Sequence, residues 1–250
     1  MTTALSAETF TMVVPQKPGD GTSIWTEIVA KELAKYLPGD TVKIKYIPGG
    51  RDIPGFNKWA EELRMDPTMM MVSHGGNAVS FLEEKVSYNY KDYDSIGMMN
   101  LNIVVGKRKD ANMNKIAFAS GSGMEPDAMA ITMMLCGPNK TVDEYGKCFE
   151  EKVTWVKGMS GGERRIAYMR GELTATRETP AAYKKHFEPM AENQLWFHHG
   201  ILQPNGKHTD DPNYKGYQFE NLFKAKYGVY PKGEFYDSYK LVKSFRDALQ

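Results

Sequence analysis

Short loops that combine glycine with hydroxyl, amide or basic side chains recur along the chain, and they are the segments best suited to bind a small anion. The first, VPQKPGDGTS, spans residues 14–23 and places Gly19 and Gly21 between a β-rich run and an expected helix. Free backbone N–H groups and the positive end of a helix dipole favour a negative charge at such a turn. A turn with only a structural role is the alternative. The pattern indicates local anion binding rather than one reaction.

Other loops repeat this composition in both halves of the chain. Arg51 lies in PGGRDIPG and His74 in SHGGN, and the second half adds SGSGMEPD and KGMSGGE, where helix capping is the alternative role. Arg177 is able to pair bidentately with a ligand carboxylate, or with the neighbouring Glu178. The residues predicted to contact a ligand are Gly19, Asp20, Gly21, Thr22, Ser23, Arg51, Asp52, Ser73, His74, Gly75, Asn77, Ser120, Ser122, Gly123, Met159, Ser160, Gly161, Arg177, Glu178 and Thr179.

The familiar sequence signatures of enzymes and metal sites are missing. The sequence contains no GxSxG, HExxH or CxxC motif. His198 and His199 are adjacent, so in a strand their rings would point to opposite faces, and we expect a solvated pair rather than a shared metal site. Glu178 and His74 are the candidates for a general base. The sequence predicts no catalytic residue, no metal and no cofactor.

The charge balance also limits the partners. Lys and Arg number 32 and Asp and Glu 31, which gives a formal net charge of +1. No global field therefore draws the protein to nucleic acid or to an anionic membrane surface. Charged residues, Pro and Gly break every apolar run well short of the roughly 20 residues that a membrane-spanning helix needs, so we expect no direct membrane insertion.

Two features bear on the cellular compartment. Residues 1–7, MTTALSA, resemble the end of a secretory signal, and a few disordered terminal residues are the alternative. Cys136 and Cys148 are the only cysteines. In an oxidising compartment they are able to form a disulfide across the loop between them, and two free thiols are the alternative.

Alternating strands and helices must position the loops. In the first half, apolar spacing predicts a helix over residues 23–36 with Ile24 and Ile28 on its buried face and Thr22 or Ser23 as its N-cap. The other elements expected there are strands at 10–15, 42–47 and 68–72 and helices at 56–64 and 78–84. Loops that follow the carboxyl ends of parallel strands line one edge of a sheet, so these loops should converge.

The second half repeats the alternation between two expected crossover segments. We expect strands at 115–120, 153–156 and 172–176, and helices at 128–137 and 164–171. The crossovers are expected near residues 102–106 and 195–201, before a loop at 203–216 and terminal helices. Two crossings between lobes would make a hinge.

The order of these segments resembles a known family, the solute-binding receptors of tripartite tricarboxylate transporters, or Bug receptors. VVPQKPGDGTSIWTEIVAKELAKYL is similar to the family's first strand, Pro- and Gly-rich loop and helix, and IPGGRDIPGFNKWAEE and TMMMVSHGGNAV are similar to its second and third loops. IAFASGSGMEPDAMA and VTWVKGMSGGERRIAYMRGELTATRETPAAY resemble the corresponding parts of its second lobe. The resemblance extends from about Phe10 to Trp196.

The resemblance implies an α/β fold of the two-lobed periplasmic binding protein type II architecture, with a ligand cleft between the lobes. Residues 8–103 and 203–250 would form a discontinuous lobe 1, and residues 104–202 lobe 2. The chain departs from the family at Gln16, Asp20 and Arg51. Arg177 and Glu178 stand where many relatives carry an aspartate that holds an amino-acid amine, so we expect a ligand with a carboxylate and no obligatory amine.

The implied function is that of an extracytoplasmic receptor, periplasmic or secreted, that closes over a small carboxylate-bearing solute and delivers it to a tripartite tricarboxylate transporter. One alternative is an orphan or sensory binding protein that has the same cleft but no transporter. The other is an enzyme acting on a small organic acid. The expected partners are therefore a small anionic solute and a membrane transporter complex, without nucleic acid.

Overall fold

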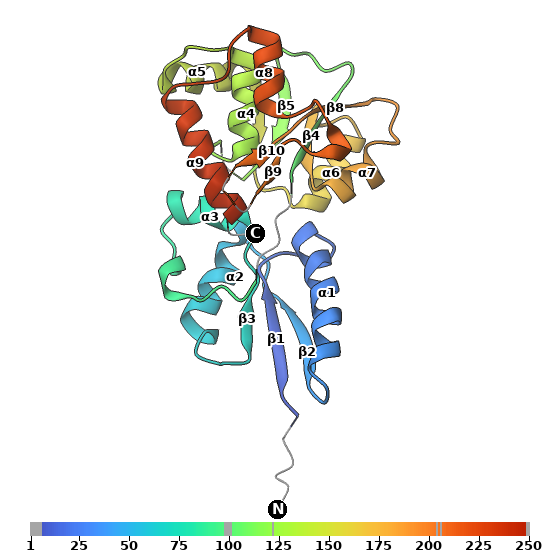
Figure 1. The fold of residues 1–250 in the computed structure, drawn as a ribbon, viewed down its shortest axis with the longest axis vertical. Helices are drawn as coiled ribbons and strands as arrows, with labels where there is room; N and C mark the ends of the chain where they lie inside the picture. The colour runs from blue at the N-terminus through green and yellow to red at the C-terminus, as the bar shows by residue number, and fades with distance from the viewer. Residues whose placement is uncertain (1–6, 98–101, 122, 204, 206, 249–250) are drawn as a thin grey trace, which may run out of the picture. The chain divides into compact units, whose positions relative to one another are not determined.

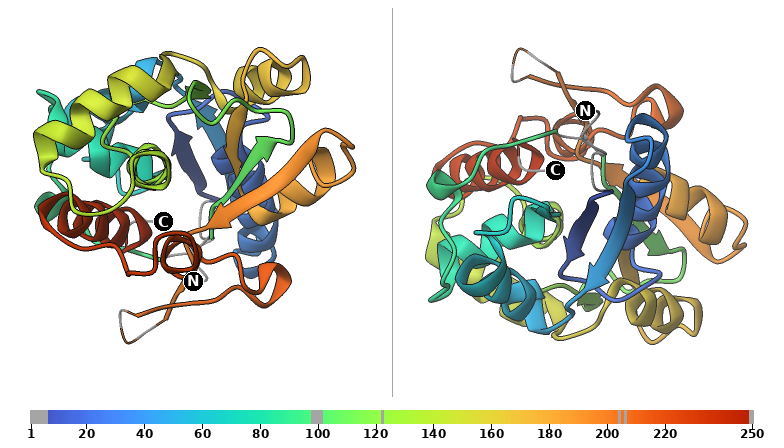
Figure 2. Two further views of the ribbon diagram at one scale, coloured as in Figure 1. Left: turned by 90° about the horizontal axis from the view of Figure 1, so that it is seen from above. Right: turned by 90° about the horizontal axis from the view of Figure 1, so that it is seen from below.

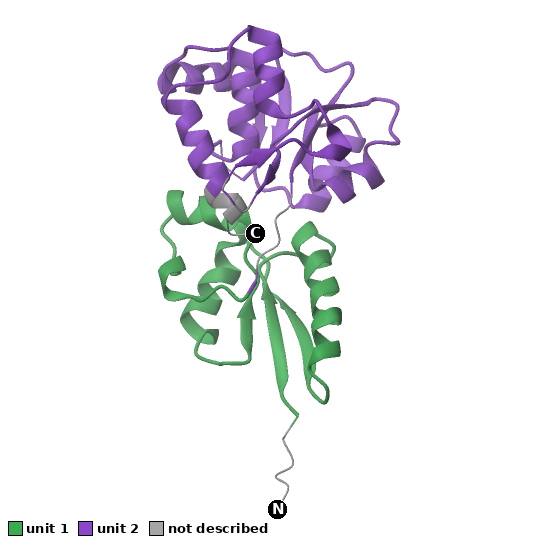
Figure 3. Cartoon of the chain, in the orientation of Figure 1, with its two compact units in different colours: residues 1–96 green, residues 97–250 purple. Residues whose placement is uncertain are grey.

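The chain divides into two compact units (Figure 3), unit 1 of residues 1–96 and unit 2 of residues 97–250. The computed structural model describes residues 7–97, 102–121, 123–203, 205 and 207–248. The sequence placed residues 203–250 with the first lobe, whereas the structure assigns them to unit 2. The reason is burial: Phe219, Phe223 and Tyr239 are fully enclosed in the main core of unit 2.

Unit 1 is built on a parallel sheet with strand order β2–β1–β3 (Figure 1). The strands are β1 (Thr9–Val14), β2 (Thr41–Tyr46) and β3 (Met69–Met71). β1 is central, and its last three residues are an apolar run buried on both faces, as parallel strands require. The predicted parallel sheet is confirmed for this unit, and all three strands end at the same edge.

Helices of unit 1 follow the strands in the predicted order. They are α1 (Gly21–Leu33), η1 (Ala34–Tyr36), η2 (Gly50–Asp52), α2 (Ile53–Lys58), η3 (Trp59–Leu63), α3 (Gly75–Glu83) and η4 (Tyr90–Asp92). Phe56 and Trp59 bury their rings with Tyr88 in one core cluster of this unit. A second cluster joins Val14 and Ala30 between the sheet and α1.

The predicted apolar face of α1 is wrong. Ile24 and Ile28 are 46% and 59% exposed, and the buried residues of the helix are Ser23, Thr26 and Ala30. These small side chains allow the helix backbone to lie close to its neighbours. The two hydroxyls are satisfied by bonds to helix carbonyls, from Ser23 Oγ to the Asp20 oxygen (2.8 Å) and from Thr26 Oγ1 to the Thr22 oxygen (2.7 Å).

Unit 2 contains two antiparallel sheets and one parallel pair of strands within the described residues. β4 (Val104–Arg108) runs antiparallel to both of its neighbours, β7 (Ala175–Glu178) and β8 (Asn193–His198). β5 (Ile116–Ala119) pairs in parallel with β6 (Val153–Val156), and β9 (Ile201–Leu202) pairs antiparallel with β10 (His208–Thr209). The two segments expected to be crossovers therefore contain β4 and β8, which are paired strands of one sheet.

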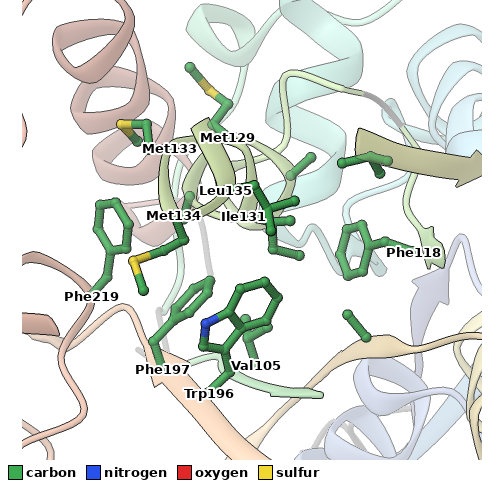
Figure 4. Packing of buried hydrophobic residues seen from close by; sticks show 14 of the residues in the cluster. Val105, Phe118, Met129, Ile131, Met133, Met134, Leu135, Trp196, Phe197 and Phe219 are labelled. Carbon is green, nitrogen blue, oxygen red and sulfur yellow. The ribbon is translucent and has the colours of Figure 1, made fainter. Parts of the chain in front are cut away.

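The core of unit 2 surrounds α4 (Pro126–Cys136). Met129, Ile131 and Met133 on this helix are fully buried and pack with Phe118 and Phe197 (Figure 4). α4 is apolar on all sides, as expected for a helix enclosed by other elements. α5 (Val142–Lys152) and α9 (Glu234–Ala248) both contact it and lie beside it (Figure 2).

The remaining helices of unit 2 are α6 (Gly161–Met169), α7 (Pro180–His186), η5 (Pro212–Tyr214) and α8 (Phe219–Tyr227). Sequence analysis did not predict α5 or α7. α5 carries a reciprocal cap between Thr141 and Glu144, a signature that is readable from the sequence. Within the described residues, every helix falls short of the length and apolar character needed to cross a membrane.

Cys136 and Cys148 form a disulfide that joins the end of α4 to α5, so the bridged alternative is confirmed. Their Cα atoms lie 6.2 Å apart and the two residues are 12 positions apart in the sequence. The bridge closes a short loop that includes the turn between the two helices.

Loss of this bridge should lower the stability of unit 2 without changing its fold. For a loop of this length the chain-entropy model gives about 3 kcal/mol at 25 °C. We expect the double variant Cys136→Ala, Cys148→Ala to lose about 2 to 3 kcal/mol in urea unfolding. A reductant should destabilise the wild type by a similar amount and leave the double variant unaffected. Equal effects of the reductant on both proteins would contradict this role.

Candidate functional site

Three loops of unit 1 meet at the imidazole of His74. Gln16 follows β1, Asp52 follows β2, and His74 itself follows β3. His74 Nε2 lies 2.9 Å from Gln16 Nε2 and hydrogen-bonds to the Asp52 carboxylate. The predicted convergence of these loops is therefore confirmed within unit 1, and the parallel sheet is its cause because all three strands end at one edge.

The hydrogen bonds of His74 fix its orientation. Nδ1 accepts a hydrogen bond from the backbone N–H of Gly76 (3.0 Å), so the ring proton lies on Nε2 and is donated to Asp52. The backbone N–H of His74 donates to Asn77 Oδ1 (2.9 Å), which completes a reciprocal cap at the start of α3. The imidazole thus connects the N-terminus of α3 to the second loop, and the Gln16 side chain of the first loop lies beside it.

Arg51 and Asp52 adopt left-handed backbone conformations, with φ of 54° and 62°. The Arg51 guanidinium bonds to Glu83 Oε2 (2.6 Å) and to Glu84 at the end of α3. These two carboxylates hold the second loop against α3. Arg51 therefore has a structural partner already, and its contact with a ligand stays a prediction.

The other predicted residues of unit 1 lie at the same edge of the sheet. Asp20, rather than Thr22 or Ser23, is the N-cap of α1, and Gly19 before it has a φ of 87°. Ser73 Oγ lies 3.1 Å from the hydroxyl of Tyr90. Gly21 and Gly75 are the first residues of α1 and α3. The N-termini of α1 and α3 thus lie at this edge, and their partial positive charges favour the binding of an anion there.

Unit 2 carries a cluster of charged side chains, here called the charged cluster: Glu125, Asp127, Arg164, Arg165, Arg177, Glu178 and His199. Arg177 lies between two carboxylates, with Glu125 Oε2 and Asp127 Oδ2 each 3.1 Å from its guanidinium. The pairing of Arg177 with Glu178 that the sequence left open is wrong. Neighbours in a strand point to opposite faces, which separates these two side chains.

Asp127 extends this network into the core. Its Oδ1 lies 2.7 Å from His199 Nε2, and His199 Nδ1 lies 2.9 Å from the Tyr239 hydroxyl. His198 points elsewhere, 2.8 Å from Asp210, and burial lowers its pKa although Asp210 opposes the shift. The two histidines do point apart as predicted. They are both fully buried, however, so the expectation of a solvated pair is wrong.

Glu178 is held by an arginine from a neighbouring helix. Its Oε2 accepts a hydrogen bond from Arg165 (3.2 Å), and the carboxylate is 6% exposed. The second oxygen, Oε1, is buried and has no hydrogen-bond partner within the described part of the chain. The ion pair with Arg165 therefore occupies one of the two carboxylate oxygens of Glu178.

Arg164 belongs to the charged cluster and was missed by sequence analysis. It is half-buried in the first turn of α6, and its Nε is buried without a hydrogen-bond partner among the described residues. Burial and then the positive charge of Arg177 lower its pKa, against the opposing effect of Glu178, Glu125 and Asp127. The signal that could have identified it is a pair of arginines directly after Gly161-Gly162-Glu163.

The remaining predicted residues of unit 2 lie in loops next to this cluster in the sequence. Ser160 caps α6 through a reciprocal pair with Glu163, so the helix-capping alternative is confirmed there. Ser120 is buried, and Thr179 is the N-cap of α7. Gly123, Met159 and Gly161 follow β5 or β6 as predicted. Ser122 lies outside the described residues.

Comparison with known proteins shows the fold. No family model matches the sequence, and no curated protein does. Among solved structures, the periplasmic binding protein BugD is similar over 95% of this chain and 81% of its own, with a TM-score of 0.62 and 16% identity. Rpa4515 from Rhodopseudomonas palustris, solved with adipate, is similar over 97% of this chain and 95% of its own, with a TM-score of 0.63 and 12% identity.

A third neighbour is MatC from the same organism, solved with bound malate. The similarity covers 97% of this chain and 84% of that one, with a TM-score of 0.59 and 14% identity. BugD carries the name of the family that the sequence resembles. BugD is a periplasmic binding protein, and the chain therefore has an α/β fold like that of a periplasmic binding protein, as the resemblance implied.

Substitution of Gly55 tests how closely the loops of unit 1 pack against one another. A Cβ at this position would lie 2.3 Å from the Ile47 carbonyl oxygen and 3.0 Å from Pro15 Cα, both on backbone after β2 and β1. We expect Gly55→Ala to cost about 1 to 3 kcal/mol in urea unfolding because backbone must move. Gly50→Ala is the matched control, since its Cβ would meet nothing within 4 Å. Equal stability of the two variants would show that the close approach is unimportant.

Substitution of Asp127 tests whether the charged cluster contributes to the stability of unit 2. The Asp127 side chain is 1% exposed, and its removal leaves Arg177 and His199 without this carboxylate. We expect Asp127→Ala to lose about 3 to 5 kcal/mol of stability in urea unfolding. Asp110 also pairs with an arginine, Arg108, but is 73% exposed. Asp110→Ala should therefore cost less than about 1 kcal/mol, and similar losses for both variants would refute the assignment.

Proposed function

We propose that the protein is an extracytoplasmic solute-binding receptor that captures a small carboxylate-bearing ligand, and that it supplies a tripartite tricarboxylate transporter. The loops of unit 1 gather polar groups that suit such a ligand, and unit 2 carries its own charged cluster.

The observation that carries this proposal is the convergence of three strand-end loops at His74. It gathers the N-termini of α1 and α3 and the polar groups of Asp52 and Gln16 at one edge of a parallel sheet. Ligands of open α/β sheets bind at such an edge. Structural neighbours with this fold were solved with malate and with adipate, which supports a carboxylate as the ligand class.

The charged groups described above argue for binding rather than catalysis. Glu178 is paired with Arg165, and His74 uses its ring nitrogens to connect loops of unit 1. A general base needs a free basic atom within reach of the proton that it removes, and the Glu178 oxygen that has no partner among the described residues is buried. Recovery of the bound acid unchanged after prolonged incubation would agree with a receptor, and its conversion would favour an enzyme.

Titration calorimetry with a panel of carboxylates tests the proposal. The panel contains malate, succinate, adipate and citrate, with sulfate and phosphate as other anions. We expect at least one carboxylate to bind with one-to-one stoichiometry. At 100 times its Kd, that ligand should stabilise the protein by about 2.7 kcal/mol. Absence of binding by folded protein across the panel would overturn the proposal.

Replacement of His74 should weaken the binding of that carboxylate. His74→Ala removes the connection between the three loops, and we expect at least a tenfold rise in Kd because the loop amides are no longer held in place. His208→Ala, in β10 of unit 2, is the control and should leave Kd unchanged. A far-ultraviolet circular dichroism spectrum like that of the wild type would establish that the variant is folded.

A further inference from the structure

The charged cluster contains one more arginine than its ion pairs use. Glu125 and Asp127 both contact Arg177, and Glu178 contacts Arg165. Within the described residues, no carboxylate lies within the 4.0 Å of an ion pair with Arg164. Each acidic group of the cluster is therefore paired with another arginine, and Arg164 is left over.

The lack of an ion pair with a carboxylate of the cluster is energetically unfavourable for Arg164 in the protein without ligand. Its Nε is buried without a hydrogen-bond partner among the residues that the structure describes, and Arg177 is close enough to oppose its positive charge. A guanidinium removed from water needs an anion or several acceptors to offset the loss of hydration. Buried groups that lack partners in a folded protein often mark a place that water or a ligand completes.

The surroundings of Arg164 would suit a carboxylate. Arg164 lies in the first turn of α6, where the partial positive charge of the helix end also attracts an anion. A guanidinium presents parallel N–H groups that match the two oxygens of a carboxylate. One ligand carboxylate would thus supply both the missing charge and the missing acceptors.

The charges around Arg164 limit which other charged groups the ligand can carry beside its carboxylate. Glu178 is already neutralised by Arg165, so it offers little attraction to an ammonium group. Arg164 and Arg177 would repel such a group. We propose that Arg164 is the residue of unit 2 that binds the ligand carboxylate, and that the ligand is an organic acid without an amine beside that carboxylate. This inference rests on the proposed function and adds the chemical class of ligand that the receptor would select.

Calorimetry with Arg164→Gln tests the assignment. The probes are malate, succinate and adipate, applied to wild type and variant in the same buffer. Because a charge-assisted, bidentate pair contributes about 1.5 to 3 kcal/mol, we expect roughly a 10-fold to 100-fold rise in Kd. Arg164→Lys keeps the charge but loses the paired N–H groups, so its Kd should lie between the two.

Arg170→Gln is the matched control. Arg170 follows the last residue of α6, and its side chain is 70% exposed. Its replacement should leave Kd unchanged. Thermal unfolding without ligand gives a second readout: Arg164→Gln should melt at or above the wild-type temperature, since it removes an unpaired charge next to Arg177. A lower melting temperature together with an unchanged Kd would show a structural role and overturn the inference.

The specificity is tested with amino analogues of the same acids. Wild type should bind aspartate at least tenfold more weakly than succinate, and 2-aminoadipate at least tenfold more weakly than adipate. Equal or tighter binding of the amino acids would refute the part of the inference that concerns the amine. Wild-type binding that survives in Arg164→Gln would refute the role of Arg164 but leave the proposed function standing. Failure of wild type to bind any of the acids would overturn both.

Discussion

The parallel alignment of β1, β2 and β3 is the constraint on which the candidate site of unit 1 depends. Parallel strands end at one edge, so residues separated by more than fifty positions, such as Gln16 and His74, come within hydrogen-bonding distance. His74 then holds the start of α3 and the second loop together through two ring nitrogens and one backbone N–H, and Gln16 of the first loop lies beside the ring. Without this alignment the same glycine-rich loops would be unrelated turns.

Unit 2 reaches a comparable concentration of polar groups by other means. Its charged cluster draws on α4, α6, β7 and the residue after β8, and its sheet is antiparallel around β4. Most of the charges neutralise one another, so the cluster is rigid and largely self-contained. Among the described residues Arg164 is the exception, and it is the group that we propose for anion recognition in unit 2.

Much of the fold could be predicted from the sequence. The strands and helices of unit 1 follow the predicted order, because β-branched runs and glycine-rich turns are local signals. The buried face of α1 could not be predicted, since apolar periodicity indicated Ile24 and Ile28 while close packing selected smaller residues. Helix α5 was not predicted because charged residues outnumber apolar ones in it, although the capping pair of Thr141 and Glu144 is readable from the sequence.

The candidate site was less predictable than the fold. Loop positions follow from strand order, so most predicted residues do lie in the expected loops. Pairing between charged side chains depends on which face of a strand or helix each one occupies and on residues distant in sequence. Arg177 and Glu178 are neighbours in the chain, yet they bind different partners, Glu125 and Arg165. Composition alone could not distinguish Arg164, which has no ion pair within the described part of the chain, from Arg165 and Arg177.

The central position of β4 has a consequence for the order of folding during synthesis. Unit 1 is continuous in sequence, so all of its contacts can form once residue 96 has emerged from the ribosome. β4 follows at once, but its partners β7 and β8 end at residues 178 and 198. The nascent chain therefore carries β4 with two open edges through the synthesis of about seventy further residues, and with one open edge for about twenty more. Unpaired strand edges promote aggregation, so a chaperone would be most useful in this interval.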